Sequence, residues 1–195
     1  MRGFRSRIQR MRENEDGLTL PELIIYSLLA VVVLGIVGNI LIQSLKIETA
    51  VRAVTETTTQ AQLGAYAVQT GIRNASDFQV TDNGGDQLLV ARTAGSGSTL
   101  TWSCLAWYYS EAEGTIRQSR SPGAITMPSA SDLLDWTLIA EDIARPATPA
   151  FNGIFNGGFP ALSIQYIGNP PGEIPVAINS SATARTDLQE SGPCF

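Results

Sequence analysis

The chain has 195 residues, which is room for one compact domain and an accessory segment. Its formal net charge of −5 disfavours general binding to a nucleic-acid backbone, because such binding needs a basic surface. The sequence contains no histidine, the side chain used most often as a general base and metal ligand near neutral pH. We therefore expect a protein that is not an enzyme and has no catalytic, metal or cofactor site.

The first part of the chain combines a basic segment with a long apolar stretch. Residues 1–12 hold five arginines and no acid, and residues 23–42 form 20 residues without a charge. As a helix this stretch spans about 30 Å, enough to cross a bilayer core. The preceding arginines predict a cytoplasmic N-terminus and an extracellular remainder. A cleaved secretory signal or a buried core helix fits the length and charge less well, whereas an uncleaved signal anchor stays open.

The junction before the apolar stretch carries a carboxylate at the membrane boundary. Residues 19–22, Thr-Leu-Pro-Glu, fit a capping box, in which Glu22 would satisfy free backbone N–H groups at the helix start. Pro21 is tolerated there because the first turn has no hydrogen bond to lose. Capping does not explain why an ionisable group stands among leucines and isoleucines, where charge at membrane depth costs several kcal/mol. Such residues usually have a partner.

At this junction the sequence resembles the type IV pilin and type II secretion pseudopilin superfamily. Precursors of that family share a charged leader ending in glycine, then a Thr-Leu-x-Glu-Leu run, then an apolar helix. The matching residues are Gly17, Thr19, Leu20, Glu22 and Leu23. Two positions depart from the usual pattern: Leu18 replaces the commonest Phe, and Pro21 replaces Ile or Val. The resemblance covers only about residues 13 to 45.

The resemblance implies a role for each matched residue. A prepilin peptidase would cut between Gly17 and Leu18 and methylate the new amine of Leu18. Glu22 would neutralise the N-terminal amine of a neighbouring subunit during filament assembly. The remaining recognition positions are Thr19, Leu20 and Leu23. The expected function is thus a structural subunit, a minor pilin or pseudopilin of a type IV pilus-like, competence or type II secretion filament.

This function carries expectations about partners and organisation. The partners would be the prepilin peptidase, other pilins or pseudopilins that contact the N-terminal helix, and a membrane protein of the assembly platform, with no nucleic acid. Loss of the leader removes five arginines and three acids, which leaves 8 basic and 15 acidic residues and a net charge of −7. The expected segments are a leader (1–17), a transmembrane helix (18–43), an amphipathic continuation (44–75) and an extracellular β-rich head (76–195).

Beyond the apolar stretch, residues 43–74 lack proline and carry apolar residues at near-helical spacing, so the helix is predicted to continue. A basic last turn and polar residues at 73–77 predict its end. The fold class is therefore α+β, with the second half of a long helix packed on an antiparallel sheet. Residues 87–92, 99–110 and 115–118 are predicted strands separated by Gly-rich turns.

The middle predicted strand places its aromatic residues on both faces. Trp102, Cys104, Ala106 and Tyr108 share one face, and Trp107 and Tyr109 the other, so the helix would cover one of them. We interpret these aromatic residues as core rather than as a ligand platform.

The last part of the chain is predicted to be loop-rich. Residues 121–160 are rich in proline and glycine, with one ordered piece at 133–143, and strands at 161–167 and 176–179 are expected to complete the sheet. Cys104 and Cys194 are the two cysteines, and a disulfide between them would tie the tail to the middle strand in an oxidising compartment. Two unrelated thiols are the alternative.

Other functional signals are weak. Residues 82–86, Asp-Asn-Gly-Gly-Asp, could offer oxygen ligands to calcium but lack the full spaced set of a calcium loop, so a plain turn is favoured.

Two other classes of function compete with the filament subunit. One is a single-pass anchored extracellular binding domain that never assembles, and the other is a tethered enzyme, which would need a site without histidine.

Overall fold

A computed structural model describes residues 19–94, 101–144, 148–154, 160–184 and 194–195. The chain divides into two compact units, residues 1–49 and residues 50–195. Helix α2 (Leu20–Arg73) contributes residues to both units, and all of the strands belong to the second. The α+β class predicted from the sequence, with a long helix packed on an antiparallel sheet, is confirmed.

Helix α2 is 54 residues long, about 80 Å at the rise of an α-helix. Its only proline, Pro21, lies in the first turn, where no intrahelical bond is lost. The helix ends at Arg73, close to the predicted boundary, and the N–H of Asn74 donates to the carbonyls of Thr70 and Gly71. From Ala50 to Arg73, where α2 belongs to the second unit, its buried residues recur every three or four positions and so lie along one face of the helix, here called the packed stripe. They are Thr57, Ala61, Gly64, Ala65, Val68, Gly71 and Ile72.

The first sheet is an antiparallel meander in the order β1-β2-β3-β4-β5. Its strands are β1 (Ala75–Asn83), β2 (Asp86–Ala94), β3 (Trp102–Ser110), β4 (Thr115–Ser121) and β5 (Thr137–Ala140). The predicted strands correspond to β2, β3 and β4. Strand β1 was not predicted because its inward positions are irregular: the register shifts between Ala75 and Asp77, and Ala75 and Phe78 are its two buried residues. The short helix η1 (Asp132–Asp135) precedes β5 within the predicted ordered piece.

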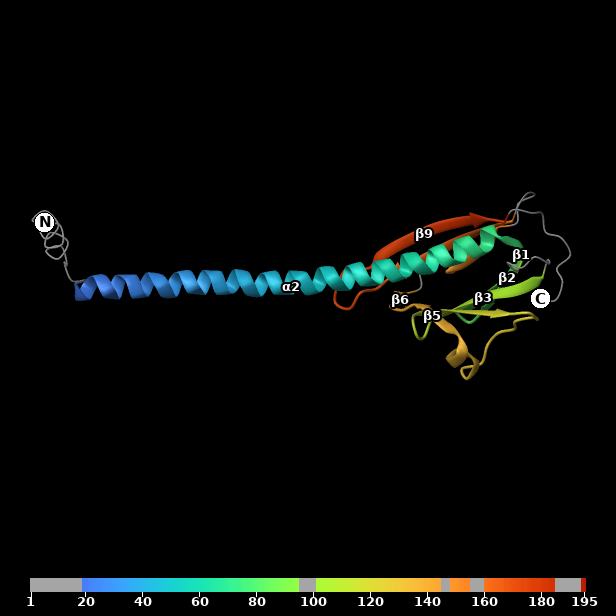
Figure 1. Ribbon diagram of the computed structural model, residues 1–195, viewed down its shortest axis with the longest axis horizontal. Coiled ribbons are helices and arrows are strands. Elements are labelled where there is room, and N and C mark those ends of the chain that lie inside the picture. The colour runs from blue at the N-terminus through green and yellow to red at the C-terminus, as the bar shows by residue number, and fades with distance from the viewer. Residues whose placement is uncertain (1–18, 95–100, 145–147, 155–159, 185–193) are drawn as a thin grey trace, which may run out of the picture. The chain divides into compact units, whose positions relative to one another are not determined.

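The later strands form a second sheet, so the prediction that they complete the first sheet is wrong. Strand β8 (Ala161–Gly168) is central and pairs with β6 (Ile143–Ala144), β7 (Phe151–Ile154) and β9 (Val176–Thr183). Its alternate residues are buried, as in a strand with one face on a core. Strand β9 runs beside the helix (Figure 1). The two are joined by a hydrogen bond in which the Gln69 amide of α2 donates to the carbonyl of Ser181 at 2.9 Å.

The main core lies where the packed stripe of α2 meets one face of each sheet. Trp107 and Tyr109 of β3 are fully buried there beside Val68 and Ile72 of the helix and Ile164 of β8. The opposite face of β3 carries Cys104, Ala106 and Tyr108 in a second apolar cluster. The predicted division of the two faces is confirmed for these residues, and Trp107, Tyr108 and Tyr109 have the predicted core role. The prediction is wrong for Trp102, which is 36% exposed at the start of β3, outside both clusters.

Gly71 lets the helix approach the sheet closely. A Cβ atom at this position would lie 2.1 Å from Cη2 and 2.5 Å from Cζ2 of Trp107. These separations are far shorter than a normal carbon contact, and the ring is fully buried, so it has little space to move. Only glycine fits between this turn of α2 and the central strand.

A buried glutamine joins the two sheets. Gln87 of β2 accepts a hydrogen bond from the N–H of Phe151 in β7 at 2.9 Å and donates to the carbonyl of the same residue at 3.3 Å. Its amide also donates to the Asp82 carboxylate at 3.1 Å. The Gln87 side chain thus bonds the backbone N–H and carbonyl of Phe151 as a neighbouring strand would, so these buried polar groups are not left without partners.

The second apolar cluster contains a disulfide. Cys104 and Cys194 are bonded with Cα atoms 5.4 Å apart, across 90 positions of the sequence. Both are fully covered and pack with Leu88, Val90 and Leu133. The bond fastens the end of the chain to the outer face of β3, as expected from the sequence.

The contact at Gly71 predicts an unusual response to alanine. Gly71→Ala should lower the thermal unfolding midpoint of the purified full chain by several degrees, because overpacking against Trp107 costs about 1–3 kcal/mol. Gly64→Ala is the matched control, since its nearest neighbour, Cβ of Ala140, is at an ordinary 3.5 Å. This control should be neutral or slightly stabilising, because alanine is favoured over glycine in a helix by about 1 kcal/mol. Equal midpoints for both variants would contradict the close packing.

The disulfide predicts that a reductant destabilises the second unit. Breaking a bond that closes a loop of this size should cost about 4 kcal/mol. The measurement is thermal unfolding followed by circular dichroism, with and without reductant. A variant with both Cys104→Ser and Cys194→Ser should be unstable from the start and insensitive to reductant. Two free thiols in the protein as purified from an oxidising compartment would show that the bond does not form.

Candidate functional site

The start of α2 carries the residues to which the sequence assigned an assembly role. Gly17 and Leu18, the predicted cleavage and methylation positions, lie outside the described residues. The other four matched positions are described. Thr19 precedes the helix, and Leu20, Glu22 and Leu23 lie in its first turns.

The chain enters the helix at Thr19. Its carbonyl accepts hydrogen bonds from the N–H of Glu22 at 2.9 Å and of Leu23 at 3.1 Å, which close the first turn. Leu20 and Leu23 are 76% and 58% exposed, so the turn presents an apolar surface.

The side chain of Glu22 does not follow the predicted capping box. Its Oε1 atom accepts a hydrogen bond from the Tyr26 hydroxyl at 3.0 Å, one turn further along the helix. Glu22 is half-buried, whereas its neighbours Pro21 and Leu23 are exposed. The bond forms because residues four apart lie on one helix face, where a phenol is long enough to reach the carboxylate. Tyr26 is not among the site residues predicted from the sequence, although its spacing of four positions from Glu22 was the available signal.

The apolar stretch that follows has no cover within the described part of the chain. Its large apolar side chains are all more than half exposed, and Leu34 is 70% exposed. This is the one helix among the described residues that is long and apolar enough to cross a membrane. Its only amide, Asn39, accepts a hydrogen bond from Gln43 at 3.1 Å. The segment from Leu23 to Leu45 contains no charged residue, so Glu22 has no cationic neighbour along it.

The possible calcium turn at residues 82–86 is engaged in structural contacts. The Asp86 carboxylate accepts from the Tyr108 hydroxyl at 2.7 Å and from the N–H of Glu111 at 2.8 Å. Burial, followed by the hydrogen bond and charge of Asp86, raises the pKa of Tyr108 to about 12. Asp82 accepts from Gln87, as described above. The turn itself is a tight hairpin with Asn83 opposite Asp86, which agrees with the favoured interpretation of a plain turn.

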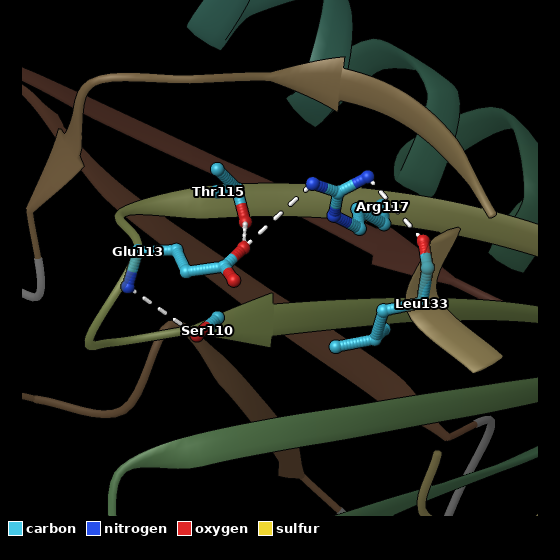
Figure 2. Close-up of polar contacts among 5 residues, drawn as sticks. All are labelled: Ser110, Glu113, Thr115, Arg117 and Leu133. Carbon is cyan, nitrogen blue, oxygen red and sulfur yellow. Dashed lines mark hydrogen bonds and ion pairs between the residues drawn. The ribbon is translucent and has the colours of Figure 1, made fainter. Parts of the chain in front are cut away.

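A second polar group lies at the β3–β4 hairpin (Figure 2). The Glu113 carboxylate accepts from the Thr115 hydroxyl at 3.2 Å and lies 3.7 Å from the Arg117 guanidinium. Arg117 also donates to the carbonyl of Leu133 at 3.3 Å, and the N–H of Glu113 donates to the Ser110 hydroxyl. These contacts tie the hairpin to η1. The ion pair is partly exposed and contributes at most about 1 kcal/mol, so we assign the group a structural role.

An open groove lies between α2 and the β4–β5 side of the first sheet. Leu63, Tyr66 and Gly71 line it from the helix, and Arg120 and Leu138 line it from the strands. Its surface is mainly apolar with one cation. Within the described ranges, no three His, Cys, Asp or Glu side chains are grouped closely enough to hold a metal ion.

Family models, curated proteins and solved structures all yield no match to this chain.

Proposed function

We propose that this protein is a structural subunit, a minor pilin or pseudopilin, of a type IV pilus-like, competence or type II secretion filament. Prepilin peptidase cuts the precursor between Gly17 and Leu18 and methylates the amine of Leu18. The observation that carries the proposal is a carboxylate, Glu22, in the first turn of a long helix with an exposed apolar stretch and no cation along it. The assignment of the family rests on the resemblance of residues 13–45.

The position of Glu22 calls for a partner from another chain. A carboxylate at the centre of a membrane helix costs about 3 kcal/mol, which is an upper bound for Glu22 in the first turn. A hydrogen bond to a charged group returns about 1.5–3 kcal/mol without removing the charge. Lys46, the next cation along the helix, is 24 positions away, about 36 Å at the helical rise. A neighbouring subunit with a free N-terminal amine supplies both charge and hydrogen-bond donors, and cleavage before Leu18 creates such an amine.

The exposed apolar stretch supports the same proposal. Lipid covers its side chains before assembly, and the helices of sister subunits cover them afterwards. Apolar side chains can pass from one environment to the other because they need no hydrogen-bond partner in either. In the second unit, α2 packs through its buried stripe, so each half of the helix has a separate role. One half anchors and assembles the subunit, and the other is part of the folded domain.

The proposed location follows from the charges that flank the apolar stretch. The arginine-rich N-terminus stays in the cytoplasm, where the prepilin peptidase acts, and the second unit lies outside, where Cys104 and Cys194 can oxidise. The subunit then passes into a pilus or pseudopilus through an assembly-platform membrane protein. It acts without catalysis, cofactor or nucleic acid.

The groove beside α2 favours a second candidate function. An apolar recess lined by Leu63, Tyr66 and Leu138, with Arg120 at its side, is the kind of surface that a binding domain uses. In this alternative the protein is a single-pass anchored extracellular binding domain that never enters a filament. Its N-terminus would remain uncut.

Processing and assembly test the proposal together. Intact-mass and N-terminal analysis of membrane-extracted protein should find a chain that begins at methylated Leu18. Glu22→Ala should be processed in the same way but lost from sheared filaments, because it cannot pair with the amine of a neighbour. The loss should be at least tenfold, the factor that corresponds to about 1.4 kcal/mol.

Glu56→Ala is the matched control, since Glu56 is an exposed carboxylate on the same helix but outside the apolar stretch. This variant should enter filaments normally. A chain that still begins at Met1 in cells with active prepilin peptidase would overturn the proposal and leave the anchored binding domain.

A further inference from the structure

The hydroxyl of Tyr26 is placed to control the direction of the Glu22 carboxylate. The two groups lie one helical turn apart and are joined by a hydrogen bond of 3.0 Å. Tyr26 is 54% exposed, and apolar residues flank it on the same segment, including Leu23 and Leu28. A phenol and a carboxylate in such surroundings each need a partner, and this bond satisfies one donor and one acceptor at once.

The neighbouring hydroxyl does not serve this purpose. Ser27 donates to the carbonyl of Ile24 at 2.8 Å, a bond within its own helix turn. Of the two adjacent hydroxyl groups, only that of Tyr26 contacts the carboxylate. Ser27 is therefore a natural control at the same depth of the helix.

The bond also decides between two uses of the carboxylate. A glutamate in the first turn can fold back to the free N–H groups of its own helix and act as a cap. Here the side chain extends forward, and Oε1 is held by Tyr26. Within the described part of the chain no hydrogen bond reaches the second oxygen, Oε2. An ionised carboxylate accepts several hydrogen bonds, so this oxygen remains available to a cation.

We infer that Tyr26 is a positioning residue for Glu22, which holds one carboxylate oxygen so that the other faces the N-terminal amine of an incoming subunit. This role rests on the proposed assembly function. Tyr26 carries no charge and cannot replace the amine, but it keeps Glu22 from capping its own helix and lowers the cost of the unpaired carboxylate before assembly. Without the hydroxyl the carboxylate turns back to the helix start, and each pairing event must first break that self-contact.

The test compares four full-length variants in competition with tagged wild-type chain: Tyr26→Phe, Ser27→Ala, Glu22→Ala and the double variant of Tyr26 and Glu22. Two quantities are measured for each, the fraction processed to Leu18 and the fraction found in sheared filaments. Tyr26→Phe should be processed normally and incorporated about tenfold less, because pairing must first break the contact of Glu22 with its own helix start, a hydrogen bond to a charged group. Ser27→Ala should match wild type in both quantities.

The double variant separates positioning from a general role in helix packing. If Tyr26 acts through Glu22, adding Tyr26→Phe to Glu22→Ala should cause no further loss. A further loss would overturn the inference, as would normal incorporation of Tyr26→Phe beside a defective Glu22→Ala, and in both cases the proposed function would stand. Normal incorporation of Glu22→Ala would overturn both the inference and the assembly role of Glu22.

Discussion

The close contact between Gly71 and the ring of Trp107 sets the distance between α2 and the central strand of the first sheet. The backbone of α2 at Gly71 packs directly on the Trp107 side chain of β3, and the rest of the main core fills the space on either side. Strand β9 lies along the helix, and Gln87 connects β2 to β7 inside the same core. The other face of β3 receives the end of the chain through Cys104. Strand β3 thus contacts both the helix and the C-terminal tail, and its neighbour β2 makes the connection to the second sheet.

The first half of the same helix obeys a different constraint, that of a charge in apolar surroundings. In the proposed membrane-spanning subunit, the hydrogen bond from Tyr26 would offset part of the cost of the Glu22 carboxylate without neutralising its charge. Under the proposed function, this helix would gain free energy in a bilayer when a neighbouring subunit presents an amine to Glu22. In the filament subunit that we propose, this difference would drive assembly independently of the fold of the second unit.

Much of the architecture follows from local patterns. Helical spacing and the absence of proline after Pro21 predict α2 almost to its last residue, and alternation predicts the two faces of β3 and the position of β8. The matched residues Gly17, Thr19, Leu20, Glu22 and Leu23 are likewise visible in the sequence, whereas Tyr26 was overlooked. Strands β5, β6 and β7 were not predicted, because two to four residues are too few to establish a period.

By itself the sequence determined the features that depend on neighbours along the chain. They are an uncharged stretch long enough to span a membrane, a carboxylate at its start, and a helix that continues beyond it. Only the tertiary structure decided which distant residues meet. It placed Gly71 against Trp107, the Gln87 amide against Phe151, and the later strands in a second sheet. The physical reason is that helical and strand periods report which face of an element is apolar, but not which apolar face it will contact. A contact between residues four apart on one helix, such as that between Glu22 and Tyr26, follows from the helical period alone. Contacts between distant elements in the core do not.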